Sequence, residues 1–200
     1  TLLKLLAGEI PACLGGGITR FPPVHSPSLQ GLRQNIGFFS PELITAHDRA
    51  QTGIQVVMSG LKGQIGPRAP FTSGDKDRAR QCMQDLDLLD MQDQDVRCLS
   101  SGQVRRLLLA RAVVHRPKML LVDEPCAGLD VRSRQDFLHT LHLLAGQGVH
   151  LVLVSHRLQD TFPALNRMLI LKKGRIAQIS TLHIHPEKDS SAQAALAATP

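Results

Sequence analysis

Two consecutive carboxylates, Asp123 and Glu124, are the side chains of this sequence best placed to do chemistry. They directly follow the wholly apolar run Met119–Val122, which begins two residues after Pro117. A short apolar run bounded by proline is typical of a strand buried on both faces of a parallel sheet. Ligands of open α/β sheets bind at the carboxyl ends of the strands, and the two carboxylates would lie at such an end.

This pair of acids suits a metal–phosphate site. One carboxylate can hold Mg²⁺ directly or through water, and the other can accept a proton from an attacking water. Taken alone, the residues fit equally well with a strand that ends in a polar Asp-Glu-Pro turn. The surrounding segments must decide between these two interpretations.

The segment LSSGQ at 99–103 predicts a second place for an anion. Ser100 stands directly before a helical pattern that runs to Val114, and it can serve as the N-cap of that helix. The first turn of a helix leaves backbone N–H groups unpaired at its positive dipole end, where an anion can dock. Gly102 lets the backbone approach that anion closely. An ordinary capped helix would explain Ser100 but not the whole string.

Composition places these segments in an ordinary globular domain. The 200 residues are 42% hydrophobic, which is enough for one domain with a sizeable core. The net charge of +6 permits a nucleic acid or an anionic membrane as partner, although polyphosphate binding or a solvated face explains it as well. The four cysteines lack paired spacing, which favours a reduced, cytosolic setting. No apolar stretch reaches the length that spans a bilayer.

The chain resembles the nucleotide-binding domain of ATP-binding cassette (ABC) ATPases in four segments, which follow one another in the order LSSGQ, MLLVDE, AGLD and VLVSH. In that family's terms they look like the signature loop, the Walker B strand with its catalytic glutamate, the D-loop and the switch histidine. The resemblance implies an α/β fold, with a P-loop NTPase-like, mostly parallel sheet and an inserted helical subdomain that carries the signature loop.

The resemblance also implies a role for each candidate residue. Glu124 would polarise the attacking water, His156 would steady the γ-phosphate, and Asp123 would bind Mg²⁺ through water. Asp130 would bridge the two halves of a head-to-tail pair. The nucleotide of the opposite domain would be contacted by the signature segment, which comprises Ser100, Ser101, Gly102 and Gln103. Ser101 stands where the family more usually has Gly, a departure expected to weaken that contact mildly.

The sequence begins at Thr1 with TLLKLLAG, which in the family continues the GxxGxGKS phosphate loop. Thr1 would follow the hydroxyl residue that ligates Mg²⁺ and would belong to the nucleotide site. The phosphate loop itself is not among these residues. We therefore expect a piece of a longer protein, cut just after that loop, which is nearly inactive alone but whose parent is an active ATPase. A natural chain that has lost the loop is the alternative.

The expected organisation is one cassette domain at 1–180, with its helical subdomain at about 42–114, and a weakly helical or disordered tail at 181–200. Within it, hydrophobic periodicity predicts helices at 54–61, 79–89, 103–114 and 131–147, strands at 35–40, 119–122 and 151–154, and a hairpin at 168–179. The strand at 151–154 is expected to be buried and to deliver His156 beside Asp123 and Glu124. The helix at 103–114 carries three arginines that we expect on polar faces or paired with acids, namely Arg105, Arg106 and Arg111.

The function implied by the resemblance is ATP binding and hydrolysis, with ATP and Mg²⁺ as cofactors. Such a domain powers transport with a second nucleotide-binding domain and transmembrane permease subunits, from a cytoplasmic position on the inner face of a membrane. The segment Ser40–Glu42 stands where the family usually carries a Gln, which leaves room for the tandem-cassette group of molybdenum transport or photorepair.

Two alternatives from other classes stay open. A cassette of DNA repair or translation would use ATP to clamp nucleic acid, which the basic charge permits. A catalytically dead module would offer only its LSSGQ surface to a competent partner.

Overall fold

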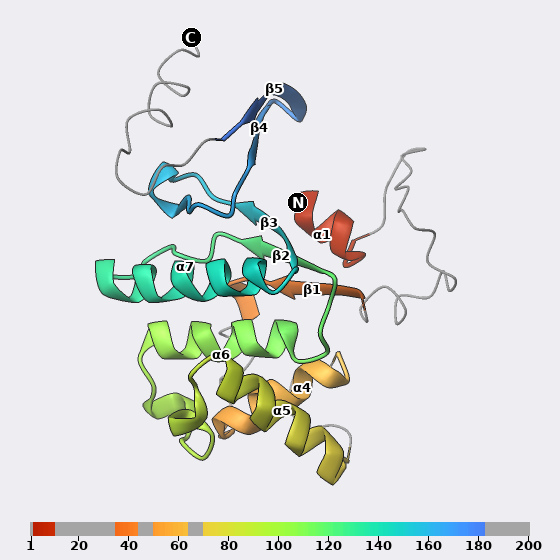
Figure 1. Cartoon of the computed structure of the whole chain (residues 1–200), viewed down its shortest axis with the longest axis vertical. Helices are drawn as coiled ribbons and strands as arrows, with labels where there is room; N and C mark the ends of the chain where they lie inside the picture. Colours follow the sequence, from red (N-terminus) through yellow and green to blue (C-terminus); the bar gives the residue numbers. More distant parts are fainter. Residues whose placement is uncertain (1, 11–34, 44–49, 64–69, 183–200) are drawn as a thin grey trace.

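The computed structural model describes residues 2–10, 35–43, 50–63 and 70–182. At its centre lies a parallel sheet of β1 (Ile36–Phe39), β2 (Met119–Asp123) and β3 (His150–Val154), in the order β1-β2-β3 (Figure 1). The register pairs Asp123 at the end of β2 with Val154 at the end of β3. The predicted strand after Pro117 and the predicted parallel sheet are therefore confirmed.

The middle strand β2 is buried on both faces, as its apolar sequence predicts. Its three central residues, 120 to 122, are each 0% exposed. Leu120 and Val122 belong to the larger core on one face, whereas Leu121 packs with Leu3 of helix α1 (Leu2–Ala7) on the other. Side chains alternate between the faces of a strand, so a strand covered by helices on both sides must be apolar throughout.

Strand β3 is less buried than the sequence suggests. Its middle residues are half-buried, and His150 and Val154 at its ends are exposed. In the described part of the sheet, β3 is an edge strand that pairs only with β2. The prediction of a buried strand was wrong, although the predicted place of the strand beside β2 is confirmed.

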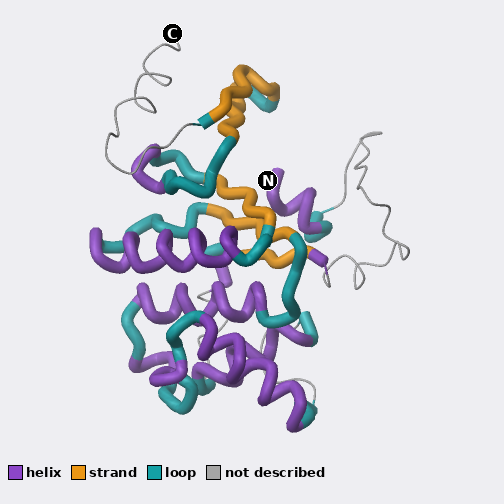
Figure 2. The backbone as a smooth tube through the Cα atoms, in the orientation of Figure 1, coloured by secondary structure: helices purple, strands orange, loops and turns teal. Residues whose placement is uncertain are grey.

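Helices α6 (Ser101–Val113) and α7 (Val131–Gly146) pack together beside the sheet, and α4 (Gly53–Leu61) and α5 (Ser73–Asp85) lie beyond α6 (Figures 1 and 2). Phe137 of α7 meets Phe39 of β1, with ring centroids 5.2 Å apart. Helix α6 is therefore enclosed between other helices and the sheet, and ten of its residues are buried.

Helix α5 does not cover the predicted range 79–89. It begins at Ser73 because Thr72 and Asp75 form a reciprocal cap: the Thr72 hydroxyl accepts the Asp75 N–H at 3.2 Å, and an Asp75 carboxylate oxygen accepts the Thr72 N–H at 2.9 Å. It ends at Asp85. Of the predicted helix beyond this point, only Leu89 is helical, as the first residue of a separate 3₁₀ turn at Leu89–Met91, and another 3₁₀ turn lies at Val96–Cys98.

The last described element is the antiparallel hairpin of β4 (Arg167–Lys172) and β5 (Arg175–Thr181), preceded by a 3₁₀ turn at Leu158–Asp160. It confirms the predicted hairpin, and the expected boundary at residue 180 falls inside β5. Most of the predicted tail, 183–200, lies outside the described residues. In the ranges given above, no helix combines the length and apolar character needed to cross a membrane.

Candidate active site

The carboxyl ends of β2 and β3 bring Glu124 and His156 into contact. His156 Nδ1 lies 2.8 Å from Glu124 Oε2. Because the strands are parallel and Asp123 is opposite Val154, the residues that follow each strand emerge at the same edge of the sheet. The Glu124 side chain is 32% exposed and that of His156 is 65% exposed, so the pair is open to a ligand. The predicted meeting of these two residues is confirmed, and their catalytic roles remain predictions.

Glu124 occupies an uncommon backbone conformation. Its φ is +43°, in the left-handed region that non-glycine residues rarely adopt. The Glu124 N–H donates to the Val154 carbonyl at 2.9 Å, which ties the turn to β3. Non-glycine residues held in this region cluster at functional sites, where the surrounding structure enforces them. The turn after β2 is thus fixed in a conformation that the side chain of Glu124 alone would not choose.

Asp123 lies half-buried beside Glu124 at the end of β2. Lys4 of α1 lies close by: its Nζ donates to Glu42 Oε2 at 2.7 Å, and this bond, with a smaller contribution from Asp123, raises the pKa of Lys4. Glu42 is thus paired with a lysine at this edge of the sheet.

Asp123 can serve as a single protein ligand for Mg²⁺. In the described part of the chain, no group of three His, Cys, Asp or Glu side chains forms a metal cage. Mg²⁺ is usually held by one or two carboxylates, with waters and substrate phosphates as its other ligands, and the site fits that pattern. Thr1, the other predicted nucleotide-site residue in this region, lies outside the described residues.

The signature segment forms the capped start of α6, as predicted. The Ser100 hydroxyl accepts the Gln103 N–H at 3.2 Å, and Gln103 Oε1 accepts the Ser100 N–H at 2.8 Å. This reciprocal cap uses the side chains of both residues. It leaves the N–H groups of Ser101 and Gly102 as the first-turn donors that can face an anion.

Asp130 caps α7 immediately beside the signature segment. Its carboxylate accepts the Ser133 N–H at 2.9 Å and the Ser133 hydroxyl at 2.7 Å, and these bonds, the backbone one first, lower the pKa of Asp130. A Cβ atom on Gly102 would lie only 2.8 Å from Ser133 Oγ. The close approach of α6 to α7 at this point therefore requires glycine at 102.

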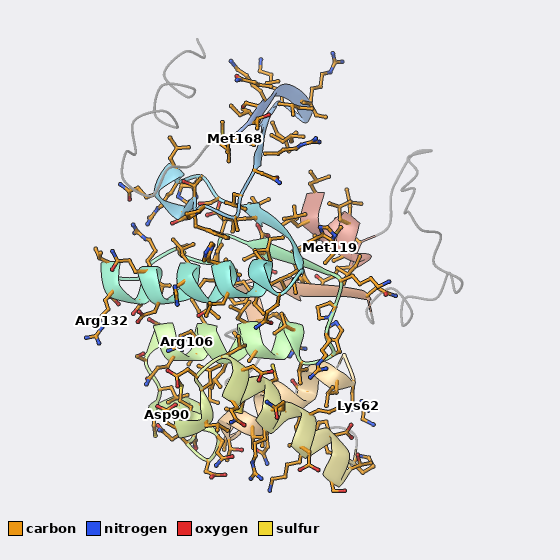
Figure 3. All side chains as sticks on the ribbon, in the orientation of Figure 1. Lys62, Asp90, Arg106, Met119, Arg132 and Met168 are labelled. Carbon is orange, nitrogen blue, oxygen red and sulfur yellow. The ribbon has the colours of Figure 1, made fainter. Side chains whose placement is uncertain are left out.

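A cavity of about 420 Å³ opens at this junction, lined by the signature segment and the first turns of α7. Arg106, Arg132 and Asp90, which also line it, lie along the same side of the molecule (Figure 3). Across the described ranges, no hydrogen bond or ion pair joins the signature segment to Glu124 or His156. One chain therefore carries two separate polar regions, one at the ends of β2 and β3 and one at the start of α6.

Two of the three arginines of α6 are buried, which the sequence did not suggest. Arg105 and Arg111 are only 8% and 9% exposed, and they donate to the Pro125 carbonyl at 3.2 Å and to Ser59 Oγ at 3.0 Å. Arg106 donates to the carbonyls of Leu86 and Asp87. The expectation was wrong for Arg105, which is buried and has no acidic partner among the described residues, and Arg111 does not lie on a polar face. Helix α6 is enclosed on nearly all sides, which a single-helix pattern cannot reveal.

Asp160 is a site residue that sequence reasoning missed. It is 1% exposed, and its Oδ2 accepts a hydrogen bond from Ser155 Oγ at 2.5 Å. The same hydroxyl accepts the Arg157 N–H at 3.0 Å, so the residues on both sides of His156 are held together. Asp160 also helps burial raise the pKa of the Cys126 thiol to about 12. No periodic signal marks Asp160, because the contact depends on how the chain turns back after β3.

The family model described as ABC transporter matches residues 1–127. An uncharacterized ABC transporter ATP-binding protein of Bacillus subtilis is 29% identical over 147 residues, covering 72% of this chain and 56% of the relative. A probable metal transport system ATP-binding protein of Chlamydia muridarum is 30% identical over 185 residues, covering 92% of this chain and 75% of the relative.

A solved structure shows the same fold. The ATP-binding cassette MJ0796, determined as a dimer in a post-hydrolysis state with ADP and Pi, aligns with a TM-score of 0.68 and 20% identity, over 92% of this chain and 80% of that one. The chain thus has the P-loop NTPase fold of ABC cassettes. Its sequence spans little more than half of the Bacillus subtilis relative. Because the family model matches well over half of the residues, the chain belongs to the ABC transporter family.

Proposed function

We propose that the protein containing this chain binds and hydrolyses ATP to power transport across a membrane. The observation that carries the proposal is the 2.8 Å contact between Glu124 and His156, next to Asp123, at the carboxyl ends of adjacent parallel strands. A carboxylate and an imidazole at this edge of an α/β sheet are placed to act on a bound ligand. The cassette comprises residues 1–180, with its helical subdomain at about 42–114.

Each group of this edge has one task in the proposed reaction. Glu124 accepts a proton from the attacking water. Nδ1 of His156 faces Glu124, which leaves Nε2 as the ring nitrogen that can contact the γ-phosphate. Asp123 holds Mg²⁺, which when bound neutralises charge on the phosphates. Phosphoryl transfer depends mainly on positioning and on charge stabilisation, and these three side chains supply both.

The signature segment serves a second cassette in this proposal. Ser101 and Gly102 offer their N–H groups, Ser100 and Gln103 fix the helix start, and Asp130 lies at the junction between the two cassettes. Its separation from Glu124 within one chain supports a head-to-tail pair in which each domain completes the other's site. The dimeric state of MJ0796 supports the same arrangement.

The wider assembly follows from the relatives. The Chlamydia muridarum relative belongs to a transport system by its name, which supports permease subunits as partners and a cytoplasmic position at the inner face of a membrane. No GxxGxGKS string occurs in the 200 residues. The Lys and Ser/Thr of that loop bind phosphate and Mg²⁺, so these 200 residues alone should turn over little ATP.

The test starts with the intact protein isolated from its source, whose mass is compared with 21.8 kDa. Phosphate release is then measured with MgATP for the wild type and for Glu124→Gln. We expect turnover in the wild type and ATP binding without turnover in the variant. Absence of turnover in the intact wild type would favour the dead-module alternative, and salt-dependent DNA or RNA binding would favour the repair alternative.

A further inference from the structure

Arg105 is a buried cation with no buried anion beside it. The residue is 8% exposed, and no ion pair joins it to a carboxylate within the described ranges. Its Nε is buried without a hydrogen-bond partner, and burial lowers its pKa. Burying an unpaired charge lowers the stability of the fold. The presence of arginine at this position therefore needs an explanation other than stability.

Within the described residues, the hydrogen bond that Arg105 donates ends at the turn after β2. Its Nη1 lies 3.2 Å from the carbonyl oxygen of Pro125, the residue directly after Glu124. A second hydrogen bond holds this turn, because the backbone N–H of Glu124 donates to the Val154 carbonyl at 2.9 Å. The left-handed backbone of Glu124, with φ of +43°, is therefore held from both sides, by β3 through one bond and by α6 through the other.

We propose that Arg105 is a positioning residue that fixes the Glu124 carboxylate from the signature helix. It acts through the Pro125 carbonyl and does not touch the substrate. Because Arg105 lies on α6 only a turn and a half beyond the Ser100 cap, it links the anion-binding start of that helix to the catalytic turn of the same chain. The role in turnover rests on the proposed function, whereas the restraint on the turn does not.

Arg105→Met tests this idea, because methionine fills much of the arginine volume but cannot donate to Pro125. Arg111→Met is the matched control, since Arg111 is 9% exposed on the same helix and donates to Ser59. Arg105→Lys is the conservative variant, since its ammonium can still reach for the carbonyl. Each variant is made in the intact protein and examined by amide hydrogen exchange, thermal unfolding and steady-state ATP hydrolysis.

We expect Arg105→Met to raise amide exchange across 124–128 and to lower kcat about tenfold while KM for ATP changes less than about twofold. Arg105→Lys should recover part of the lost kcat. Arg111→Met should change thermal stability without a selective rise in exchange at this turn. The split between kcat and KM distinguishes a misplaced catalytic group from a loss of nucleotide binding.

Two results would overturn the inference. One is unchanged exchange at 124–128 in Arg105→Met, which would show that Arg105 does not restrain the turn whether or not the protein hydrolyses ATP. The other is faster exchange with an unchanged kcat, which would show that the restraint does not serve catalysis. If the wild type has no turnover, the proposed function fails, and the exchange data still decide whether Arg105 holds the turn.

Discussion

The start of α6 and the carboxyl ends of β2 and β3 both present polar groups at the surface, but they are built differently. At the start of α6, the side chains of Ser100 and Gln103 each accept the backbone N–H of the other residue, three positions away in the chain. At the strand ends, Glu124 and His156 stand 32 residues apart in sequence and meet only because β2 and β3 pair in one register. The first region is local, and the second is assembled by the sheet.

The two regions should respond differently to substitution. A local cap depends on two side chains and contributes to helix stability. An assembled pair depends on every contact that sets the register, since a one-residue slip would turn each side chain to the other face. Substitutions in the assembled region should therefore change the chemistry, whereas those in the cap should change stability.

The largest effect should come from Glu124→Gln. The amide keeps the shape of the side chain but cannot take a proton from water, so turnover of the intact protein should fall at least about 100-fold. ATP affinity, measured by equilibrium binding, should stay close to that of the wild type. Asp93→Asn, at an exposed carboxylate, is the control. Unchanged phosphate release in Glu124→Gln would remove Glu124 as the base.

The second largest effect should follow His156→Ala. Loss of the imidazole removes the 2.8 Å contact with Glu124 and a donor toward the phosphate, so kcat should drop about 10- to 100-fold. Urea unfolding should hardly change, because the His156 side chain is 65% exposed. His139→Ala, at an exposed position of α7, provides the comparison. A similar kcat in both variants would leave His156 without a catalytic role.

The local region should respond in stability. Ser100→Ala removes the cap acceptor for the Gln103 N–H and should lower the free energy of unfolding by about 1 kcal/mol. Ser100→Thr retains a hydroxyl and should restore most of that loss, as followed by urea denaturation. Equal stabilities of the wild type and Ser100→Ala would mean that tertiary packing, rather than the cap, fixes the start of α6.

The smallest effect concerns the rate at which two cysteines of the wild type react with a thiol reagent. Burial raises the pKa of Cys126 to about 12, so its thiolate is scarce at pH 8, whereas Cys98 near the signature segment is exposed. N-ethylmaleimide at pH 8 should modify Cys98 quickly and Cys126 only after unfolding, as mapped by peptide mass spectrometry. Rapid labelling of Cys126 in the folded protein would show that the turn after β2 opens readily.

Much of the fold could be predicted from the spacing of hydrophobic residues and from the residues that begin and end helices and strands. The apolar run after Pro117 identified β2, and Ser100 before a helical pattern identified the start of α6. The bounds of α5 were missed because its start depends on the Thr72 and Asp75 cap rather than on apolar spacing. The exposure of β3 was missed because a strand sequence does not say whether a neighbour covers its outer edge.

The candidate site divides in the same way. The types of its residues were readable, since carboxylates, an imidazole and a glycine after a capping serine carry their chemistry in the sequence. The contacts of Arg105 with Pro125 and of Asp160 with Ser155 were not readable, because each joins elements whose approach is set by packing. Arginine is mostly exposed in folded proteins, so the burial of Arg105 could not be expected from its residue type.

The groups available for chemistry could therefore be predicted from residues close together in the chain. They are the acids after β2, the imidazole after β3 and the capped helix start. Contacts between distant segments set the distance between Glu124 and His156, the left-handed turn at Glu124 and the burial of Arg105. Caps and strand propensities act between residues close together in the chain, whereas register and burial arise from many weak contacts between distant segments.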